Sequence, residues 1–269
     1  MFNITRNGLD AIGKELGVIS NNIANANTNA FKRSRSEFVD FYSKALSSNP
    51  KTKSGLGAAL QGTQKIMKQG SPILTGSALD LTISGKGFFI LSPKEGAEPR
   101  FTRDGSFSLN SKGNLITTEG FNVAGYPRQE DGSLNYSAAV PLNIPLTLET
   151  DGKILLLSKL DVNNQGIIET TYGLNNIVKR GQIALAKFNN EIELKSKGSN
   201  TYQATQKSGE QILGTAMSSN YGEILSGSLE SSNTNISVEM INLIKTQQAF
   251  NGNARILQSN VEVTRRLMN

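Results

Sequence analysis

Apolar residues near the start of the chain recur in alternating steps of three and four positions. The series comprises Leu9, Ile12, Leu16, Ile19 and Ile23. This spacing places every member on one face of an α-helix, as in the heptad seam of a coiled coil. Polar residues such as Asp10 and Lys14 fall on the opposite face, as an amphipathic helix requires. The asparagine-rich stretch 25–29 is expected to end this helix, because asparagine side chains compete for backbone hydrogen bonds.

The end of the chain repeats this pattern over a longer segment. Its seam positions are Ile236, Met240, Leu243, Gln247, Phe250, Ala254, Leu257, Val261, Thr264 and Met268. Gln247 and Thr264 are polar, and Gly252 within the segment lowers helix stability. Because no further helical segments flank these two helices, we expect them to pair with each other. The alternative is that each helix packs separately on the rest of the protein as ordinary core.

Between the two ends, the hydrophobic period changes from helical spacing to alternation. Short alternating runs occupy 79–83, 88–91, 107–109, 115–118 and 183–188. Dipeptides that favour turns separate them: Asp104-Gly105, Lys112-Gly113, Asp131-Gly132 and Asp151-Gly152. Strands and turns at this spacing predict a mainly antiparallel β domain. The expected fold class is therefore α+β, with the terminal helices paired as a coiled-coil-like helical domain.

The changes of pattern divide the chain into three parts. The terminal helical domain is expected to combine residues 1–30 with 231–269, and the β-rich outer domain to occupy 71–230. Residues 31–70 are expected to form a connector, because their centre at 47–55 is polar and rich in serine and lysine. A segment of this composition is flexible unless a partner orders it.

The chain contains no cysteine and no histidine. Their absence removes disulfides, thiolate nucleophiles, Ser-His-Asp triads and most transition-metal sites. An enzyme would have to use carboxylates, as a glycoside hydrolase acting on the cell wall does. The acidic residues are scattered, for example Asp80, Asp104, Glu119 and Glu130, and fit turns or solvated strand faces. Glycines at 55–57 and 85–87 do not open a phosphate-binding motif, so no catalytic residue, metal site or cofactor is expected.

The formal net charge of +6 is small for a chain of 269 residues. The dense basic run 32–35 is followed by Glu37 and Asp40 and lacks an aromatic platform, so nucleic-acid binding is not expected. The longest apolar runs, such as 154–157, are far shorter than the roughly 20 residues that a membrane helix needs. Residues 1–7 lack the pattern of a cleavable signal peptide. The expected location is the cytoplasm, or a compartment reached by a route that reads no such signal.

Two heptad seams leave apolar surface uncovered until the helices pair or pack against neighbouring molecules. A head-to-tail contact whose rotation does not close generates an open helical filament. The pattern therefore predicts a self-assembling structural protein with helices at its axis and β domains outside. The alternative is a secreted β-rich binding module anchored by the terminal helices, which needs a ligand site on the β domain and no assembly through the seams.

Three stretches carry short motifs in a fixed order. They run from Ile19 to Lys32, from Leu79 to Phe107, and from Gly227 to Ile244. The motif positions are Asn21, Asn22, Ala24, Asn25, Thr28, Phe31, Lys32, Gly85, Gly87, Phe88, Phe89, Arg103, Asp104, Gly105, Leu229, Glu230 and Asn233. Together they resemble the signatures of the bacterial flagellar basal-body rod and hook (axial) protein family.

Two positions depart from the family pattern. Ala30 stands where the family has glycine, so the backbone there is expected to avoid a glycine-only conformation. Residues 247–250 read Gln-Gln-Ala-Phe in place of Gln-Arg-Ala-Tyr, which removes the arginine and the tyrosine hydroxyl. The short connector favours a proximal-rod member over a distal-rod member, with a distal-rod or hook-like paralogue as the alternative.

The resemblance implies a structural, non-enzymatic subunit that stacks helically with itself and with other rod and hook subunits. The resulting drive shaft would transmit motor torque to the hook. The resemblance also implies export through the flagellar type III apparatus, without a cleavable signal peptide, to the periplasm-spanning rod of the basal body. Peptidoglycan and the surrounding ring proteins are further candidate partners, whereas nucleic acid and membrane insertion are not expected. The expected assembly residues are Leu9, Ile12, Leu16, Ile19, Ile23, Met240, Leu243, Gln247, Phe250, Leu257 and Val261.

Overall fold

The computed structural model describes residues 2–42, 55–92, 98–128, 134, 136, 139–150, 153–173, 176–218 and 220–268. The chain divides into two compact units. The first, here called the helical unit, comprises Met1–Asn27, Lys32–Ile66 and Thr234–Asn269. The second, the β unit, comprises Thr28–Phe31 and Met67–Asn233. The predicted turns at 131–132 and 151–152, and the polar centre of the connector at 47–54, lie outside the described residues.

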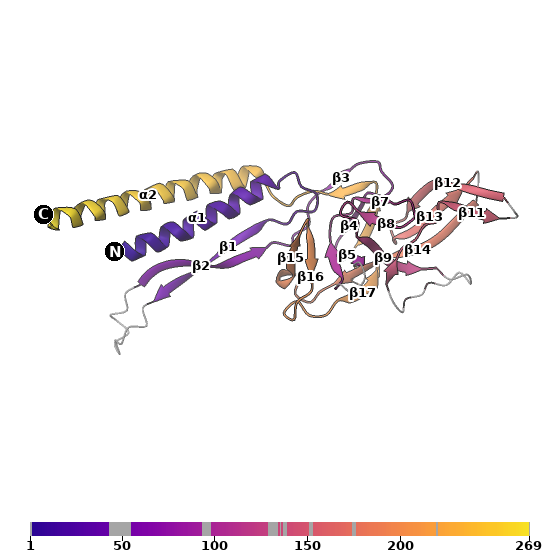
Figure 1. The fold of residues 1–269 in the computed structure, drawn as a ribbon, viewed down its shortest axis with the longest axis horizontal. Helices are drawn as coiled ribbons and strands as arrows, with labels where there is room; N and C mark the ends of the chain where they lie inside the picture. Colours follow the sequence, from indigo (N-terminus) through magenta and orange to yellow (C-terminus); the bar gives the residue numbers. More distant parts are fainter. Residues whose placement is uncertain are drawn as a thin grey trace. The chain divides into compact units, whose positions relative to one another are not determined.

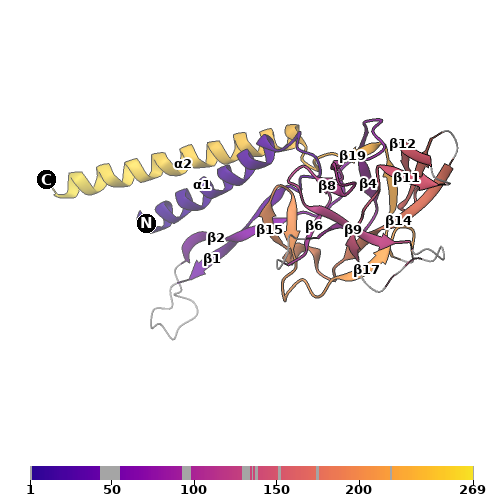
Figure 2. The same ribbon diagram turned by 45° about the vertical axis from the view of Figure 1, so that its right-hand side comes forward.

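The helical unit is built on two helices, α1 (Phe2–Ala24) and α2 (Ile236–Met268). They run side by side in both views (Figures 1 and 2), which confirms the predicted pairing of the terminal helices. After α1, the backbone and side-chain amides of Asn25 both donate to the carbonyl of Asn21, at 3.2 and 2.9 Å, and the helix stops there as predicted. No helix among the described residues is long and apolar enough to cross a membrane.

Two strands complete the helical unit, β1 (Ser34–Tyr42) and β2 (Gly55–Lys65). They pair antiparallel, with Ser34 opposite Lys65. β2 lies against α1, and a Cβ added at Gly57 would lie 3.3 Å from the carbonyl oxygen of Ile4. The structure thus differs from the expectation of a connector over 31–70, because residues 32–66 group with the helices. The strands gain cover from α1, a contact that their mixed polar sequence does not reveal.

The β unit contains many short strands, labelled in Figures 1 and 2. They are β3 (Pro72–Leu74), β4 (Leu81–Ser84), β5 (Phe88–Ser92), β6 (Arg100–Thr102), β7 (Phe107–Leu109), β8 (Leu115–Thr117), β9 (Asn122–Pro127), β10 (Val140–Pro141), β11 (Thr147–Thr150), β12 (Lys153–Val162), β13 (Ile167–Tyr172), β14 (Asn176–Lys187), β15 (Lys195–Gly198), β16 (Thr201–Gln203), β17 (Ile212–Thr215), β18 (Glu223–Ser226) and β19 (Ser228–Glu230). One 3₁₀ turn, η2, spans Glu191–Glu193.

The main sheet of the β unit follows the order β11-β12-β13-β14-β9-β5-β6-β16-β15. Two small pairs accompany it, β18 with β4 and β19 with β3. Every strand pairing among the described residues is antiparallel. This arrangement confirms the predicted antiparallel β domain and the α+β class.

Strand β5 is buried on both faces. Side chains of successive residues point to opposite faces of a strand, and Phe88 and Phe89 accordingly belong to two different apolar clusters. Phe89 packs edge-on to Phe107, with ring centres 5.1 Å apart. Phe88 contacts Phe188 and Tyr202 in the same manner, at 6.1 and 6.0 Å. The Phe-Phe pair of the family motif therefore joins the two halves of the core.

Candidate assembly interface

Two contacts define the register between α1 and α2. Asn22, near the end of α1, places its Nδ2 3.4 Å from Oε2 of Glu239, near the start of α2. Gly8, near the start of α1, faces Asn253, whose Nδ2 would lie 3.6 Å from a Cβ added at Gly8. Fourteen residues separate the two contacts along each helix. The helices therefore run antiparallel in a constant register.

The face of α2 that lies against α1 is mainly polar. Glu239 and Thr246 are buried on it, and Leu243, Asn253, Leu257 and Asn260 are partly buried. These positions again follow steps of three and four, but four of the six are offset by one residue from the predicted apolar series. On α1 the buried side chains are Thr5, Ala11, Ile19 and Asn22. Small and polar groups thus fill much of the contact between the two helices.

The predicted seam residues fall into two groups. Ile19 is buried, and Leu9, Ile12, Leu16, Ile23, Leu243 and Leu257 are partly buried within the helical unit. Met240, Gln247, Phe250 and Val261 are exposed. Contact between copies through any of these residues stays a prediction. The exposed side chains are the ones free to meet a neighbouring copy.

α2 exposes further apolar side chains that the predicted series did not include. They are Val238, Ile241, Ile244, Ile256, Val263 and Leu267. Contiguous apolar surface of this kind marks interaction sites on soluble proteins. The signal was present in the sequence, since α2 carries apolar residues on more than one face, but a search for one heptad series discards them.

A polar joint fixes α1, α2 and β1 together inside the helical unit. The Asn22 side chain donates to the carbonyl of Ser34 at 2.8 Å and accepts its N–H at 2.9 Å. The buried carboxylate of Glu239 lies 3.1 Å from Nη1 of Arg33. A cavity of about 100 Å³ adjoins the joint, and Glu15 lines it. Partial burial raises the pKa of the Glu15 carboxyl.

A second joint, centred on Glu230, holds distant segments of the β unit together. The backbone carbonyl of Glu230 accepts the N–H of Ala30 at 2.7 Å. Its carboxylate accepts the N–H of Gly70 at 2.8 Å and lies 3.7 Å from Nη1 of Arg103. Both charged side chains are buried, and the Arg103 guanidinium lies 5.1 Å from the centre of the Phe88 ring. Burial lowers the pKa of Arg103, and the charge of Glu230 opposes that change.

Three of the predicted motif positions, Phe88, Arg103 and Glu230, therefore meet in this joint. The structure also explains the motif glycines. Gly85 has φ +120°, which favours glycine, and a Cβ at Gly105 would lie 1.7 Å from the carbonyl oxygen of Leu81. The sequence motifs thus encode the internal joints of the two units.

Ala30 adopts a left-handed backbone conformation, with φ +55°. This small region admits L-residues at a cost of roughly 1–2 kcal/mol. Alanine therefore occupies a position whose positive φ favours glycine, the residue that the family has there. Full burial of the alanine side chain accompanies the strain.

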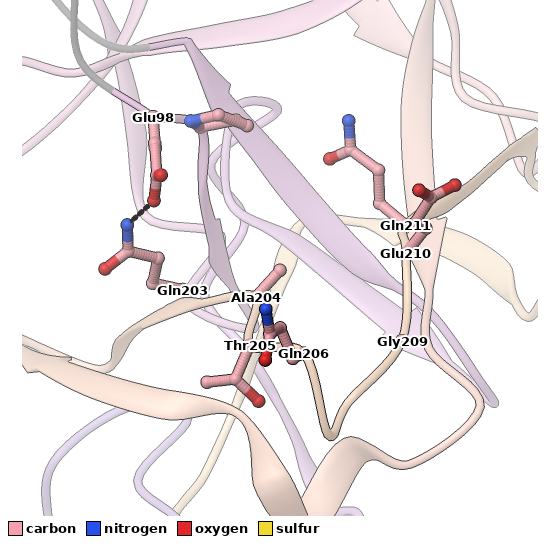
Figure 3. A pocket seen from close by; sticks show the side chains of 9 residues that line it. Glu98, Gln203, Ala204, Thr205, Gln206, Gly209, Glu210 and Gln211 are labelled. Atoms are coloured by element: carbon pink, nitrogen blue, oxygen red, sulfur yellow. Dashed lines mark hydrogen bonds between the residues drawn. The ribbon is translucent and has the colours of Figure 1, made fainter.

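The β unit also carries an open cavity of about 700 Å³ (Figure 3). Glu98, Gln203 and Glu210 are among the side chains that line it, and the Gln203 amide donates to Glu98. No cluster of acidic side chains able to hold a metal ion is found among the described residues. Its size and its polar side chains make this cavity the candidate ligand site of a binding module.

Comparison with known proteins assigns the chain to a family. Residues 2–32 match the family described as flagella basal body rod protein, residues 82–170 match the flagellar hook protein FlgE/F/G D1 domain, and residues 225–269 match the flagellar basal body rod FlgEFG protein C-terminal family. The flagellar basal-body rod protein FlgG of Buchnera aphidicola subsp. Schizaphis graminum is 32% identical, over 98% of this chain and 96% of the relative. The chain belongs to the flagellar rod and hook protein family.

Other relatives agree with this assignment and confirm the resemblance read from the motifs. FlgG of Agrobacterium fabrum is 31% identical over 94% of this chain and 92% of its own length. The flagellar hook protein FlgE of Helicobacter pylori is 34% identical, over 71% of this chain but 25% of the hook protein. The rod proteins therefore match along their whole length, and the hook protein matches in part.

Proposed function

We propose that this chain is a structural subunit of the flagellar basal-body rod. It stacks helically with copies of itself and with other axial subunits into the drive shaft that transmits motor torque to the hook. The observation that carries this proposal is the match to FlgG over 98% of the chain, which includes both helices and the β unit.

Torque transmission requires each unit to keep its shape under load. In the helical unit, the Asn22–Glu239–Arg33 joint resists sliding between the helices and β1. In the β unit, Glu230 holds Ala30, Gly70 and Arg103 through one backbone and two side-chain contacts. A side chain with several buried polar partners rigidifies the packing around it. The two joints suit a part whose work is mechanical.

We further propose that the subunit leaves the cell through the flagellar type III apparatus and works in the periplasm-spanning rod. Passage as an unfolded chain suits a sequence without cysteine, since a disulfide would have to form after transit. Peptidoglycan and the surrounding ring proteins are the further partners that such a location brings into reach.

The test is to delete the gene in its native bacterium and restore it with a tagged copy. We expect the deletion to abolish swimming, the tagged copy to restore it, and the tag to lie along the rod of isolated basal bodies. Normal rods in the deletion strain, or a tag found away from the basal body, would contradict the proposal.

The 700 Å³ cavity favours a second candidate, a secreted binding module anchored by the helices. Removal of residues 236–269 separates the two functions. A binding module keeps a saturable ligand site after this deletion, whereas a rod subunit loses assembly and the cells lose motility.

A further inference from the structure

Three segments of the β unit form the open cavity of about 700 Å³ (Figure 3). They are residues 98–99 before β6, residues 203–206 at the end of β16, and residues 209–211 before β17. In Figure 3 the side chains of Glu98 and Gln203 lie on one side of the cavity, and those of Glu210 and Gln211 lie on the other. The volume falls within the roughly 300–1,000 Å³ of sites that bind small molecules.

Hydrogen bonds hold the loop between the second and third segments in one shape. The hydroxyl of fully buried Ser208 accepts the N–H of Thr205 and donates to the Thr205 carbonyl, both at 2.9 Å. The Thr205 hydroxyl accepts the N–H of Ser208 at 3.1 Å and donates to the carbonyl of Glu193 at 2.8 Å. The loop is thus tied to itself and to the 3₁₀ turn η2, so this side of the cavity is formed before a ligand arrives.

The side chains that line the cavity offer negative charge without a balancing cation. Glu98 and Glu210 supply carboxylates, which only accept hydrogen bonds, and three glutamines supply carboxamides, which donate and accept. The Gln203 amide donates to Glu98 and thereby orients that carboxylate. No lysine or arginine is among the described residues of the lining, although the chain as a whole carries a formal charge of +6. The lining therefore favours a cationic ligand over an anionic one.

Two further features narrow the class of ligand. No described residue of the lining is aromatic, so the cavity offers no ring on which a nucleobase could stack. The acidic side chains form no cluster able to hold a metal ion among the described residues. The cation that fits is one that donates hydrogen bonds, namely a primary ammonium group. Peptide groups suit the carboxamides beside it, because each peptide group carries one donor and one acceptor.

We propose that this cavity binds a short peptide through a free primary amine. The ammonium group donates to the carboxylate of Glu98, and Glu210 adds a second negative charge. Hydrogen bonds between charged groups are roughly twice as strong as those between neutral groups. The carboxamides of Gln206 and Gln211 pair with the peptide groups of the ligand. The peptide stems of the cell wall carry such an amine and are within reach of a periplasmic rod. That source of the ligand rests on the proposed function, whereas the site does not.

Titration of the purified full chain, followed by the NMR signals of its backbone amides, tests the site. The probes are a soluble peptidoglycan stem peptide that contains a diamino acid, the same peptide with its amines acetylated, a short synthetic lysine peptide, and a wall disaccharide without peptide. Glu98→Gln and Glu210→Gln each remove one charge from the cavity. The matched control is Glu119→Gln, which removes the same charge from an exposed turn between β8 and β9. All three glutamates are exposed, so the variants should fold as the natural chain does.

We expect the two peptides with free amines to shift the signals of residues 203–211 saturably, and the acetylated peptide and the disaccharide to shift none. Glu98→Gln should weaken the affinity by about tenfold or more, Glu210→Gln should weaken it too, and Glu119→Gln should leave it unchanged. Saturable binding of the acetylated peptide or the disaccharide would overturn the proposal. So would unchanged affinity in Glu98→Gln, or no saturable shift with either free amine.

One outcome separates the site from the source of its ligand. If the lysine peptide bound and the stem peptide did not, the site would stand and the cell wall would be overturned as its source. All of these measurements use the isolated chain. A failure of the rod function, which shows in the position of the tagged protein, is therefore distinguishable from a failure of this proposal.

Discussion

Ala30 sits at a strained position that the structure uses as a joint. Its φ is +55°, its side chain is fully buried, and its N–H donates to the carbonyl of Glu230. Ala30→Val should lower the free energy of unfolding by roughly 2–4 kcal/mol, because a β-branched residue adds strain at positive φ and overfills the site. Urea titration of the purified chain measures this change.

Ala30→Gly is the matched variant. This variant relieves the backbone strain, but it loses a buried methyl group and gives the unfolded chain more conformational entropy. The three effects roughly offset, so the free energy of unfolding should change by no more than about 1 kcal/mol. If Val were tolerated as well as Gly, the site would be neither strained nor closely packed.

Glu230 should be costly to remove because its partners stay buried. Glu230→Ala leaves Arg103 without its buried counter-charge and Gly70 without its acceptor, so we expect a loss of roughly 3–5 kcal/mol. The control is Glu169→Ala, which removes a partly exposed ion pair with Lys179 and should cost under about 1 kcal/mol. A double-mutant cycle with Arg103→Met measures the coupling. Equal losses at Glu230 and Glu169 would refute a buried joint.

Glu15 gives the helical unit a dependence on pH. Partial burial raises the pKa of its carboxyl above the ordinary value of 4.5. The folded state therefore holds this proton more tightly than the unfolded state, and stability falls as pH rises from 4.5 through the folded pKa. Glu15→Gln removes that penalty, so its thermal midpoint should exceed that of the natural chain at pH 7 and converge with it below pH 4.5. A gap that widened toward acid would contradict the assigned direction.

At the scale of elements, the helices were predictable because a period of 3.5 to 3.6 residues survives in a single sequence. The face of α2 that meets α1 was not predictable. α2 is apolar on several sides, and the longest apolar series ran through Met240, Gln247 and Val261, whereas the internal contact buries Glu239 and Thr246. Glu239 is accommodated there because it bonds to Asn22, and Asn253 because it lies against Gly8. Both neighbours are on α1, more than two hundred residues away in the chain.

The fold of the β unit was likewise predictable only in part. Alternation and turn glycines predicted antiparallel strands, and the motif positions Arg103 and Glu230 proved to be neighbours. Their pairing was not predictable, because the two residues lie 127 positions apart in the sequence and nothing local links them. The β1–β2 pair was missed for a related reason: its stability draws on α1, and 31–70 alone has the composition of a linker.

Gly252 offers a test of α2 as an element. A Cβ added there would meet nothing within 4 Å, so Gly252→Ala should gain only helix propensity, about 1 kcal/mol. The measurement is the thermal midpoint of the helical signal in circular dichroism. The comparison is Gly8→Ala on α1, whose Cβ would lie 3.6 Å from the Asn253 side chain, an ordinary van der Waals contact, and which should gain at least as much. No gain at Gly252 would mean that low helix propensity at this position does not limit the stability of α2.

At the scale of the whole molecule, two adjacent residues separate folding of the subunit from its assembly. Leu243 is partly buried on the face of α2 toward α1, and Ile244 is 55% exposed. Leu243→Asp puts a charge beside buried Glu239 in the contact between the helices, so we expect roughly 3 kcal/mol of destabilisation, loss of helical signal in the isolated chain and loss of swimming. Ile244→Asp should leave the isolated chain as helical and as stable as the natural one, because its side chain has little to lose there.

Swimming should nevertheless fail with Ile244→Asp, since the new charge would be buried only when the next copy docks. Gln258→Asp, at an exposed polar position of α2, should change neither stability nor motility and controls for the added charge. Circular dichroism of the purified chains and swimming in soft agar provide the two readouts. If Ile244→Asp cells swam normally, the exposed side of α2 at Ile244 would not be an assembly interface. If Leu243→Asp kept full helicity, the register that places Leu243 against α1 would be wrong, because Asn22 and Arg33 on that side already bind the carboxylate of Glu239.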